Sequence, residues 1–368
     1  MNHFPLRCIC VALLSGRLLA VEAAPDQTIS ALPKSAALAA DTPQQVELGR
    51  LLFFDPILSA TREVACATCH HPDHGWADGR STPLGVNARG LGPKRKVSKS
   101  SDLAPLLRNT PTILNTAFNG IENTKSHDPQ VAPMFWDNRV QSLESQALVP
   151  IESREEMRGD ACSKTAAVPQ MVERLKAIPE YQKRFATEIT GPRVAQAIAA
   201  YERTLITPDS PFDRFIRGDP DGLTVQQKAG MQAFQKAGCA LCHNGPMLSD
   251  FKLHSIGITD SASPRADFRT PSLRNLRHTA PYMHNGGLMT LEQVLLFYDR
   301  LSDQVSETLD GGDASSLPPL DPLLQKLNLL PEDHGNIISF LGALSADDYD
   351  RLMPDRVPSG LSLPGRDR

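Results

Sequence analysis

The feature that most constrains this chain is a cysteine–histidine motif that occurs twice, as "CATCH" at residues 66–70 and as "CALCH" at 239–243. With 7 cysteines and 10 histidines among 368 residues, chance alone predicts roughly 0.004 matches to C-x-x-C-H. Two thiols three positions apart can each add to a vinyl group of a porphyrin, and the adjacent imidazole can then ligate the iron. The motifs therefore predict two covalent c-type haems, held by Cys66, Cys69 and His70 and by Cys239, Cys242 and His243.

Other uses of these cysteines fit less well. A zinc ribbon needs two C-x-x-C knuckles at closer range, and a thioredoxin-type pair needs neither the histidine nor the repeat. Without Cys8 and Cys10 of the N-terminal segment, five cysteines remain, of which four lie in the motifs. This count argues against a disulfide framework. The fifth, Cys162, is predicted to be unpaired.

The N-terminus and the overall charge bear on where the protein works. Residues 1–23 combine Arg7, an apolar stretch and a small-residue pattern before Ala24, which predicts a signal peptide and a periplasmic protein. An amphipathic first helix is the alternative, because Arg17 interrupts the apolar stretch. A net charge of −4 gives no indication of nucleic-acid binding, and no stretch beyond the leader is long and apolar enough to cross a membrane.

The flanks of the two motifs indicate a duplication. A glycine and a phenylalanine stand four apart before each motif (Gly49 and Phe53; Gly230 and Phe234), on segments predicted to be helices that lead towards a haem. Between the halves, "VAQAIAAYERTLI" places apolar residues on one helical face, and "PDSP" follows as a joint. We predict two mainly helical domains with long irregular loops, an N-terminal one over residues 24–207 and a C-terminal one over 208–368.

Together with "MFWDNRVQSLESQALVPIESREEM" and "RTPSLRNLRHTAPYMHNGGLMTLEQVLLFY", the two motifs resemble the bacterial di-haem cytochrome c peroxidase family, and in particular its MauG-like branch. The resemblance covers nearly all of the chain after the leader. It implies two cytochrome-c-like domains with a calcium ion between them. One haem, predicted to be the N-terminal one, would react with hydrogen peroxide, and the other would transfer electrons.

The resemblance also assigns roles to individual residues. Trp136 corresponds to an indole between the two haems, and a buried core tryptophan is the alternative. Gln146, Pro150 and Glu156 correspond to residues over the open face of the peroxidatic haem, where a carboxylate can move a proton between the oxygens of a peroxide. Glu155 is the alternative carboxylate. Pro150 has no backbone N–H and cannot ligate iron.

The same resemblance implies a calcium site with oxygen ligands, a donor set that suits this hard cation. The ligands would be Asn109 and the backbone carbonyl groups of Thr279 and Pro281. From the sequence alone, both segments read as turns.

The chain departs from many family peroxidases at two places. The loop "ADGRSTPLGVNARGLGPKRKVSKSS" after the first motif contains no histidine that could block the first iron, and His71 and His74 lie too close to the motif to reach the opposite face. We therefore expect an open first haem in the resting enzyme. The basic run from Lys94 to Lys99 in this loop is most simply a solvated segment.

The second departure concerns the sixth ligand of the second haem. A helix is expected to begin at Thr290, with Gln293 completing a capping box, and Tyr298 then stands where the peroxidases have a methionine. A phenolate stabilises more oxidised iron, whereas a thioether raises the reduction potential. Tyrosine here is typical of the MauG-like branch, whose members store two oxidising equivalents across both haems. Met283 or Met289 as ligand is the alternative.

The leading interpretation is therefore a periplasmic enzyme that consumes hydrogen peroxide and oxidises residues on a partner protein. A peroxidase fed by a small cytochrome c or a cupredoxin is the first alternative, and a non-catalytic di-haem electron carrier is the second. A homodimer is one option for its assembly.

Overall fold

The computed structural model describes residues 28–36, 41–98, 102–122, 127–258, 267–309 and 320–366. The predicted signal peptide, residues 1–23, lies outside the described residues. Within the described ranges the fold is mainly helical with long irregular connections, which confirms the expected fold class at that level.

The α-helices are distributed over the described parts of the chain. They are α1 (Pro43–Phe54), α2 (Cys66–Cys69), α3 (Leu143–Glu152), α4 (Lys164–Lys176), α5 (Pro179–Phe185), α6 (Gly191–Glu202), α7 (Pro211–Ile216), α8 (Val225–Lys236), α9 (Leu291–Leu309) and α10 (His334–Ala343). Several begin at the side-chain caps that their sequences offer. Thr224 and Gln227 cap α8 reciprocally, and Ser210 and Asp213 cap α7 in the same way.

The strands are short and form antiparallel pairs. They are β1 (Ala88–Arg89) with β2 (Lys96–Val97), β3 (Pro133–Met134) with β4 (Val140–Gln141), and β5 (Leu253–Ser255) with β6 (Asp267–Arg269). In the last pair, His254 lies opposite Phe268. Met134 of β3 belongs to a small hydrophobic cluster, with Val140 of β4 packed against it.

The two glycine–phenylalanine pairs of the sequence mark equivalent helix packings. Gly49 of α1 faces the carbonyl group of Ala197 on α6, and Gly230 of α8 faces that of Asn336 on α10, each so closely that an added Cβ atom would overlap it. The absence of a side chain therefore lets the paired backbones approach. Both segments are helices, as predicted, and Phe53 and Phe234 are buried.

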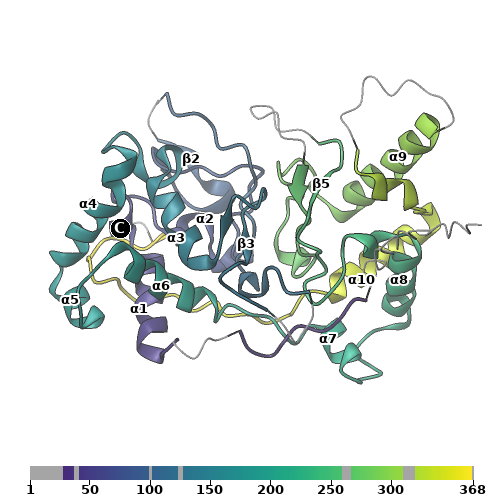
Figure 1. Cartoon of the computed structure of the whole chain (residues 1–368), viewed down its shortest axis with the longest axis horizontal. Coiled ribbons are helices and arrows are strands. Elements are labelled where there is room, and N and C mark those ends of the chain that lie inside the picture. Colours follow the sequence, from purple (N-terminus) through teal and green to yellow (C-terminus); the bar gives the residue numbers. More distant parts are fainter. Residues whose placement is uncertain are drawn as a thin grey trace, which may run out of the picture.

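Two large hydrophobic clusters lie at opposite ends of an elongated molecule. Figure 1 shows α1–α6 at one end and α7–α10 at the other. The first cluster contains Phe53, Trp76 and Tyr201, and the second contains Phe234 and Phe340. The predicted face of α6 is buried as expected: Val194, Ile198, Tyr201 and Leu205 are each at most 1% exposed.

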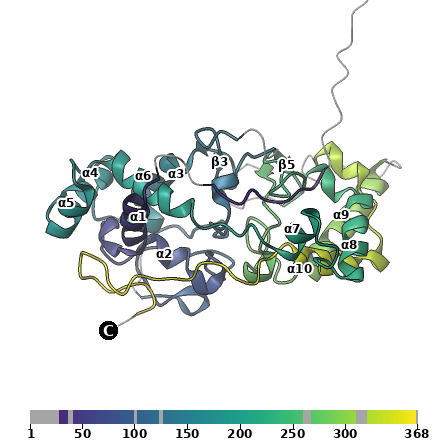
Figure 2. The ribbon, with the colours of Figure 1, turned by 90° about the horizontal axis from the view of Figure 1, so that it is seen from below.

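Each end of the described chain crosses to the opposite cluster. Near the N-terminus, Ile29 pairs with Gly245 and belongs to the second cluster. After α10, the chain runs back along the molecule to the first cluster, as both views show (Figures 1 and 2). There the Ser359 hydroxyl donates to Asp55 across 2.6 Å. The domain division near residue 207 stays a prediction.

Candidate functional site

The first motif lies on α2 and the turn that follows it. The Thr68 side chain accepts a hydrogen bond from the Ala65 amide across 2.9 Å, which starts the helix. The His70 Nδ1 atom lies 3.2 Å from the carbonyl oxygen of Trp76, and a carbonyl can only accept, so Nδ1 carries the proton. Burial lowers the pKa of His70 to about 4, so its imidazole is neutral. Such an imidazole offers Nε2 as a metal ligand.

The second motif repeats this arrangement. Cys239–Leu241 form a 3-10 turn, and the His243 Nδ1 atom lies 3.0 Å from the carbonyl oxygen of Leu248. Burial lowers the pKa of His243 as well. Both histidines are therefore oriented by a backbone carbonyl group a few residues further on, and burial lowers the pKa of both.

A second repeat supports the two motifs. The segments "TPTILN" at 110–115 and "TPSLRN" at 270–275 are related by T-P-[TS]-x-x-N. The Thr112 hydroxyl donates to the Gly75 carbonyl across 2.6 Å, and the Ser272 hydroxyl donates to the Met247 carbonyl across 2.7 Å. Each bond fixes the turn just after a haem motif. The sequence analysis did not identify this repeat, although its regular spacing was visible.

The two repeats meet at a single residue. Asn115 and Asn275 both adopt the left-handed conformation, and both donate through Nδ2 to the Thr207 hydroxyl, across 2.7 and 2.9 Å. Thr207 is buried and also donates its amide to Asn115 across 2.7 Å. This node joins the two halves at the residue where the sequence predicted a domain boundary.

A cavity of about 700 Å³ extends between the two motifs. Of the residues predicted from the sequence, it is lined by Cys66, Cys69, His70, Asn109, Trp136, Gln146, Pro150, Glu155, Glu156, His243, Thr279, Pro281, Met283 and Tyr298. Cys239 and Cys242 do not line it. The structure thus brings most of the predicted residues to one space.

The residues of the first motif fit a bound haem, and at the second motif His243 reaches the same cavity. Both neutral imidazoles reach the cavity, and the walls are largely apolar, as a porphyrin requires. The thiols of Cys66 and Cys69 stand at the wall beside His70. Burial raises the pKa of Cys69 to about 12, so without haem it is a protonated thiol.

Trp136 lies in the connection between β3 and β4. Its indole N–H donates to the backbone carbonyl of Asn109 across 2.9 Å, and its own carbonyl accepts from the Arg269 amide across 2.7 Å. Its ring meets the ring of His284 edge-on, at 6.4 Å between centroids. The side chain lines the cavity that both histidines share, whereas its role as a relay stays a prediction.

The three residues predicted over the first haem come from α3 and the turn after it. Gln146 and Pro150 are one helical turn apart on α3, and Glu156 lies in the π-helical turn Arg154–Arg158. Burial raises the pKa of Glu156, and the charge of Arg139 opposes this shift only in part. Glu155 also lines the cavity, so it stays the alternative to Glu156 as the carboxylate that transfers the proton.

Tyr298 and Met283 both face the cavity from the second half. Burial, together with the charges of Cys239 and Cys242, raises the pKa of the Tyr298 phenol. A phenolate there therefore requires a bound metal ion to displace the proton. Met289 is 56% exposed and does not line the cavity, which leaves Tyr298 and Met283 as the two candidates for a ligand.

The predicted calcium ligands lie along the same wall. Asn109 is buried; its amide donates to the His284 carbonyl across 2.7 Å, and its Nδ2 donates to the Arg80 carbonyl across 2.7 Å. Thr279 and Pro281 approach from the other half of the chain. The calcium site stays a prediction.

The histidines next to the first motif do not line the cavity. His71 is buried, with its amide bonded to the Ala77 carbonyl, and the His74 ring lies against Gly92. We had expected the basic run in the same loop to be solvated, but one of its residues is buried. Arg95 is 5% exposed and donates to the carbonyl groups of Leu84, Gly85 and Gly90.

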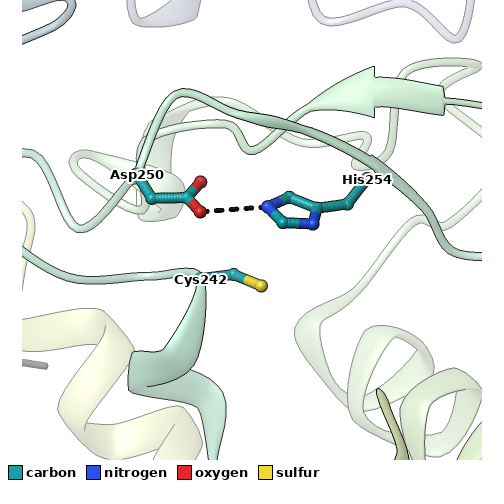
Figure 3. Close-up of side chains that lie close together, drawn as sticks. All are labelled: Cys242, Asp250 and His254. Carbon is teal, nitrogen blue, oxygen red and sulfur yellow. Dashed lines mark hydrogen bonds and ion pairs between the residues drawn. The ribbon is translucent and has the colours of Figure 1, made fainter. Parts of the chain in front are cut away.

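A charged cluster beside the second motif was missed by the sequence analysis (Figure 3). The His254 Nε2 atom lies 3.0 Å from Asp250, and its Nδ1 lies 2.6 Å from Asp321. Asp250 contributes most, with Cys242 and Asp321, to raising the pKa of His254 to about 11. His254 is therefore an imidazolium that donates from both nitrogens to carboxylate oxygens.

Comparisons with known proteins agree with this geometry. Residues 43–221 match the family model "Di-haem cytochrome c peroxidase". The methylamine utilization protein MauG of Methylorubrum extorquens is 34% identical over 85% of this chain and 81% of its own. The cytochrome c551 peroxidase of Pseudomonas aeruginosa is also 34% identical, over 82% of this chain and 79% of its own.

The fold has solved counterparts. A MauG-like protein associated with microbial copper homeostasis superposes with a TM-score of 0.65 at 24% identity, covering 86% of this chain and 95% of that one. The fold and the paired histidine sites define a c-type di-haem oxidoreductase of the peroxidase type. The chain belongs to the di-haem cytochrome c peroxidase family. Among the described residues, no helix is long and apolar enough to cross a membrane.

Proposed function

We propose that this protein is a periplasmic MauG-like enzyme. In this proposal, hydrogen peroxide reacts at the haem held by Cys66, Cys69 and His70. The oxidising equivalents pass through Trp136 to the haem held by Cys239, Cys242 and His243, and residues of a partner protein are finally oxidised. The observation that carries the proposal is the single cavity into which His70, Trp136 and His243 all project.

Bound haem would supply the iron at which the peroxide is reduced. The chain's own contribution at the first site is proton movement and access. A Glu156 carboxylate oxygen would take the proton from the iron-side oxygen of the peroxide and return it to the departing oxygen. Gln146 would hold the peroxide by a hydrogen bond. Pro150 offers no donor or ligand, so that face stays open.

Two features support partner oxidation over simple peroxide removal. Tyr298, which we propose as the sixth ligand of the second haem, lines the cavity, and neither His71 nor His74 lines it. A calcium ion held by Asn109, Thr279 and Pro281 would stabilise the wall to which Trp136 is bonded.

The cytochrome c peroxidase reading remains the second candidate. It is favoured by Met283, a thioether on the same cavity wall, and by the 34% identity to the c551 peroxidase, equal to that with MauG. Mixing the fully ferric protein with one equivalent of hydrogen peroxide separates the two. The MauG-like enzyme reacts at once at both haems, whereas the alternative enzyme reacts only after one electron has been added.

A further inference from the structure

Two oxidisable side chains lie directly behind the first histidine. Trp76 is fully buried, and its carbonyl oxygen accepts the hydrogen bond from the His70 Nδ1 atom across 3.2 Å. Tyr201 of α6 is 1% exposed, and its ring meets that of Trp76 edge-on at 6.1 Å between centroids. A line of contacts thus runs from the first motif through an indole to a phenol, and neither of these two side chains lines the cavity that Trp136 lines.

The second half provides an internal comparison. There the carbonyl that accepts from His243 belongs to Leu248, which adopts the same left-handed backbone as Trp76. The side chain whose Cβ atom stands against Gly230 belongs to Phe340, just as the Cβ atom of Tyr201 stands against Gly49. Leucine and phenylalanine are far harder to oxidise than tryptophan and tyrosine. The oxidisable pair is therefore present behind the first motif and replaced behind the second.

The line continues towards the surface. The indole N–H of Trp76 donates to the backbone carbonyl of Asp350, an exposed residue, across 2.8 Å. The charges of Asp350 and Arg50 also act on the Tyr201 phenol, and the Arg50 side chain is 25% exposed. The Tyr201 hydroxyl has no hydrogen-bond partner among the described residues. Charged groups of both signs therefore lie near the outer end of the pair.

We propose that Trp76 and Tyr201 form a second electron relay, which discharges the first haem site to the protein surface independently of Trp136. The relay rests on the proposed function, because hydrogen peroxide is its oxidant. Trp76 gives one electron to the oxidised site and becomes a radical cation, with its N–H still bonded to Asp350. Tyr201 then returns an electron to the indole and loses its phenolic proton to solvent water, because no acceptor among the described residues lies within hydrogen-bond distance of its hydroxyl. This leaves a neutral tyrosyl radical.

A small one-electron donor from solvent, such as a phenol or ascorbate, would complete the cycle by returning one electron and one proton to Tyr201. Two such turns supply the two electrons and two protons that reduce one hydrogen peroxide to two waters. The relay would thus transfer oxidising equivalents from the first haem site to small donors in solvent when no partner protein is bound.

The test uses the ferric holoprotein, carrying ring-deuterated tyrosine or not, frozen soon after one equivalent of hydrogen peroxide is added. We expect an EPR radical signal that narrows on deuteration, as a tyrosyl radical does. Tyr201→Phe removes this signal, and Trp76→Phe removes it as well because the electron path is broken. Tyr181→Phe is the matched control, since Tyr181 is equally buried in the same cluster, and it retains the signal.

The outcomes separate the relay from the function it rests on. Haem absorption that does not respond to peroxide in the wild type overturns the proposed function, and the relay with it. A wild type that responds, with a tyrosyl signal unchanged by Tyr201→Phe, overturns the relay alone. If Trp76→Phe fails to hold haem, Tyr201→Phe still decides, because it removes only a hydroxyl without a partner among the described residues.

Discussion

The indole nitrogen of Trp136 lies 2.9 Å from the backbone carbonyl oxygen of Asn109. The residue predicted to relay electrons is therefore hydrogen-bonded to a residue predicted to bind calcium. Asn109 is in turn fixed from both sides, by the His284 carbonyl and the Arg80 carbonyl. A change at the cation site would shift Asn109 and, through this bond, the indole.

Removal of calcium should consequently change both haem sites. We expect one calcium ion per chain by elemental analysis, and a reversible change in haem absorption and peroxide reactivity after chelation. Calcium should restore both properties, whereas magnesium should not, because magnesium demands a smaller octahedral site. A protein without calcium that is indifferent to a strong chelator would eliminate this site.

Glu156→Gln should keep both haems but slow the reaction with hydrogen peroxide by about 10² to 10⁴-fold, the usual contribution of general acid–base catalysis. Stopped-flow absorption of the haem measures this rate. Glu155→Gln is the matched control and should leave the rate near that of the wild type. If Glu155→Gln is the slow variant, the two roles are exchanged.

The Glu156 carboxyl group should also set the pH dependence of the reaction with hydrogen peroxide. Burial raises the pKa of Glu156 above its ordinary value of 4.5, and only the deprotonated form accepts a proton. The reaction rate should therefore fall as the pH falls through this raised pKa, at a higher pH than for an exposed glutamate. Glu156→Gln should abolish this limb of the profile; an unchanged profile would assign it to another group.

Tyr298→Met should raise the reduction potential of the second haem, because a thioether favours ferrous iron more than a phenolate does. Redox titration followed by haem absorption measures the potential. Met283→Leu is the paired variant and should leave the potential unchanged. A shift with Met283→Leu but not with Tyr298→Met would identify the methionine as ligand and favour the cytochrome c peroxidase reading.

Gly230→Ala should destabilise the protein by about 1–3 kcal/mol or more, because the new methyl group overlaps the Asn336 carbonyl where α8 meets α10. Gly335→Ala is the control on α10, since nothing lies within 4 Å of its added Cβ atom. That change should be neutral or stabilise by up to about 1 kcal/mol. Urea unfolding compares them, and equal midpoints would contradict the packing described here.

Short-range patterns predicted much of this site. The C-x-x-C-H motifs and the glycine–phenylalanine pairs each lie within one or two helical turns, where the spacing of residues fixes their geometry. Residues matched through the family resemblance, such as Trp136 and Tyr298, also line the expected cavity. Their chemical roles remain predictions.

Long-range contacts could not be predicted in the same way. Thr207 looks like an ordinary loop residue, yet it receives hydrogen bonds from two asparagines that are 160 residues apart in sequence. Arg95 stands in a basic run, yet it is buried and donates hydrogen bonds to three backbone carbonyl groups. His254 becomes an imidazolium only because folding brings Asp250 and Asp321 to either side of it.

The central claim is that the first haem has an open face while the second has two axial ligands. Low-temperature EPR of the fully ferric holoprotein tests this claim most directly. We predict one high-spin and one low-spin haem in equal amounts, with the high-spin signal lost on adding one equivalent of hydrogen peroxide. Two low-spin haems whose EPR signals do not change on adding hydrogen peroxide would contradict the account and indicate a non-catalytic electron carrier.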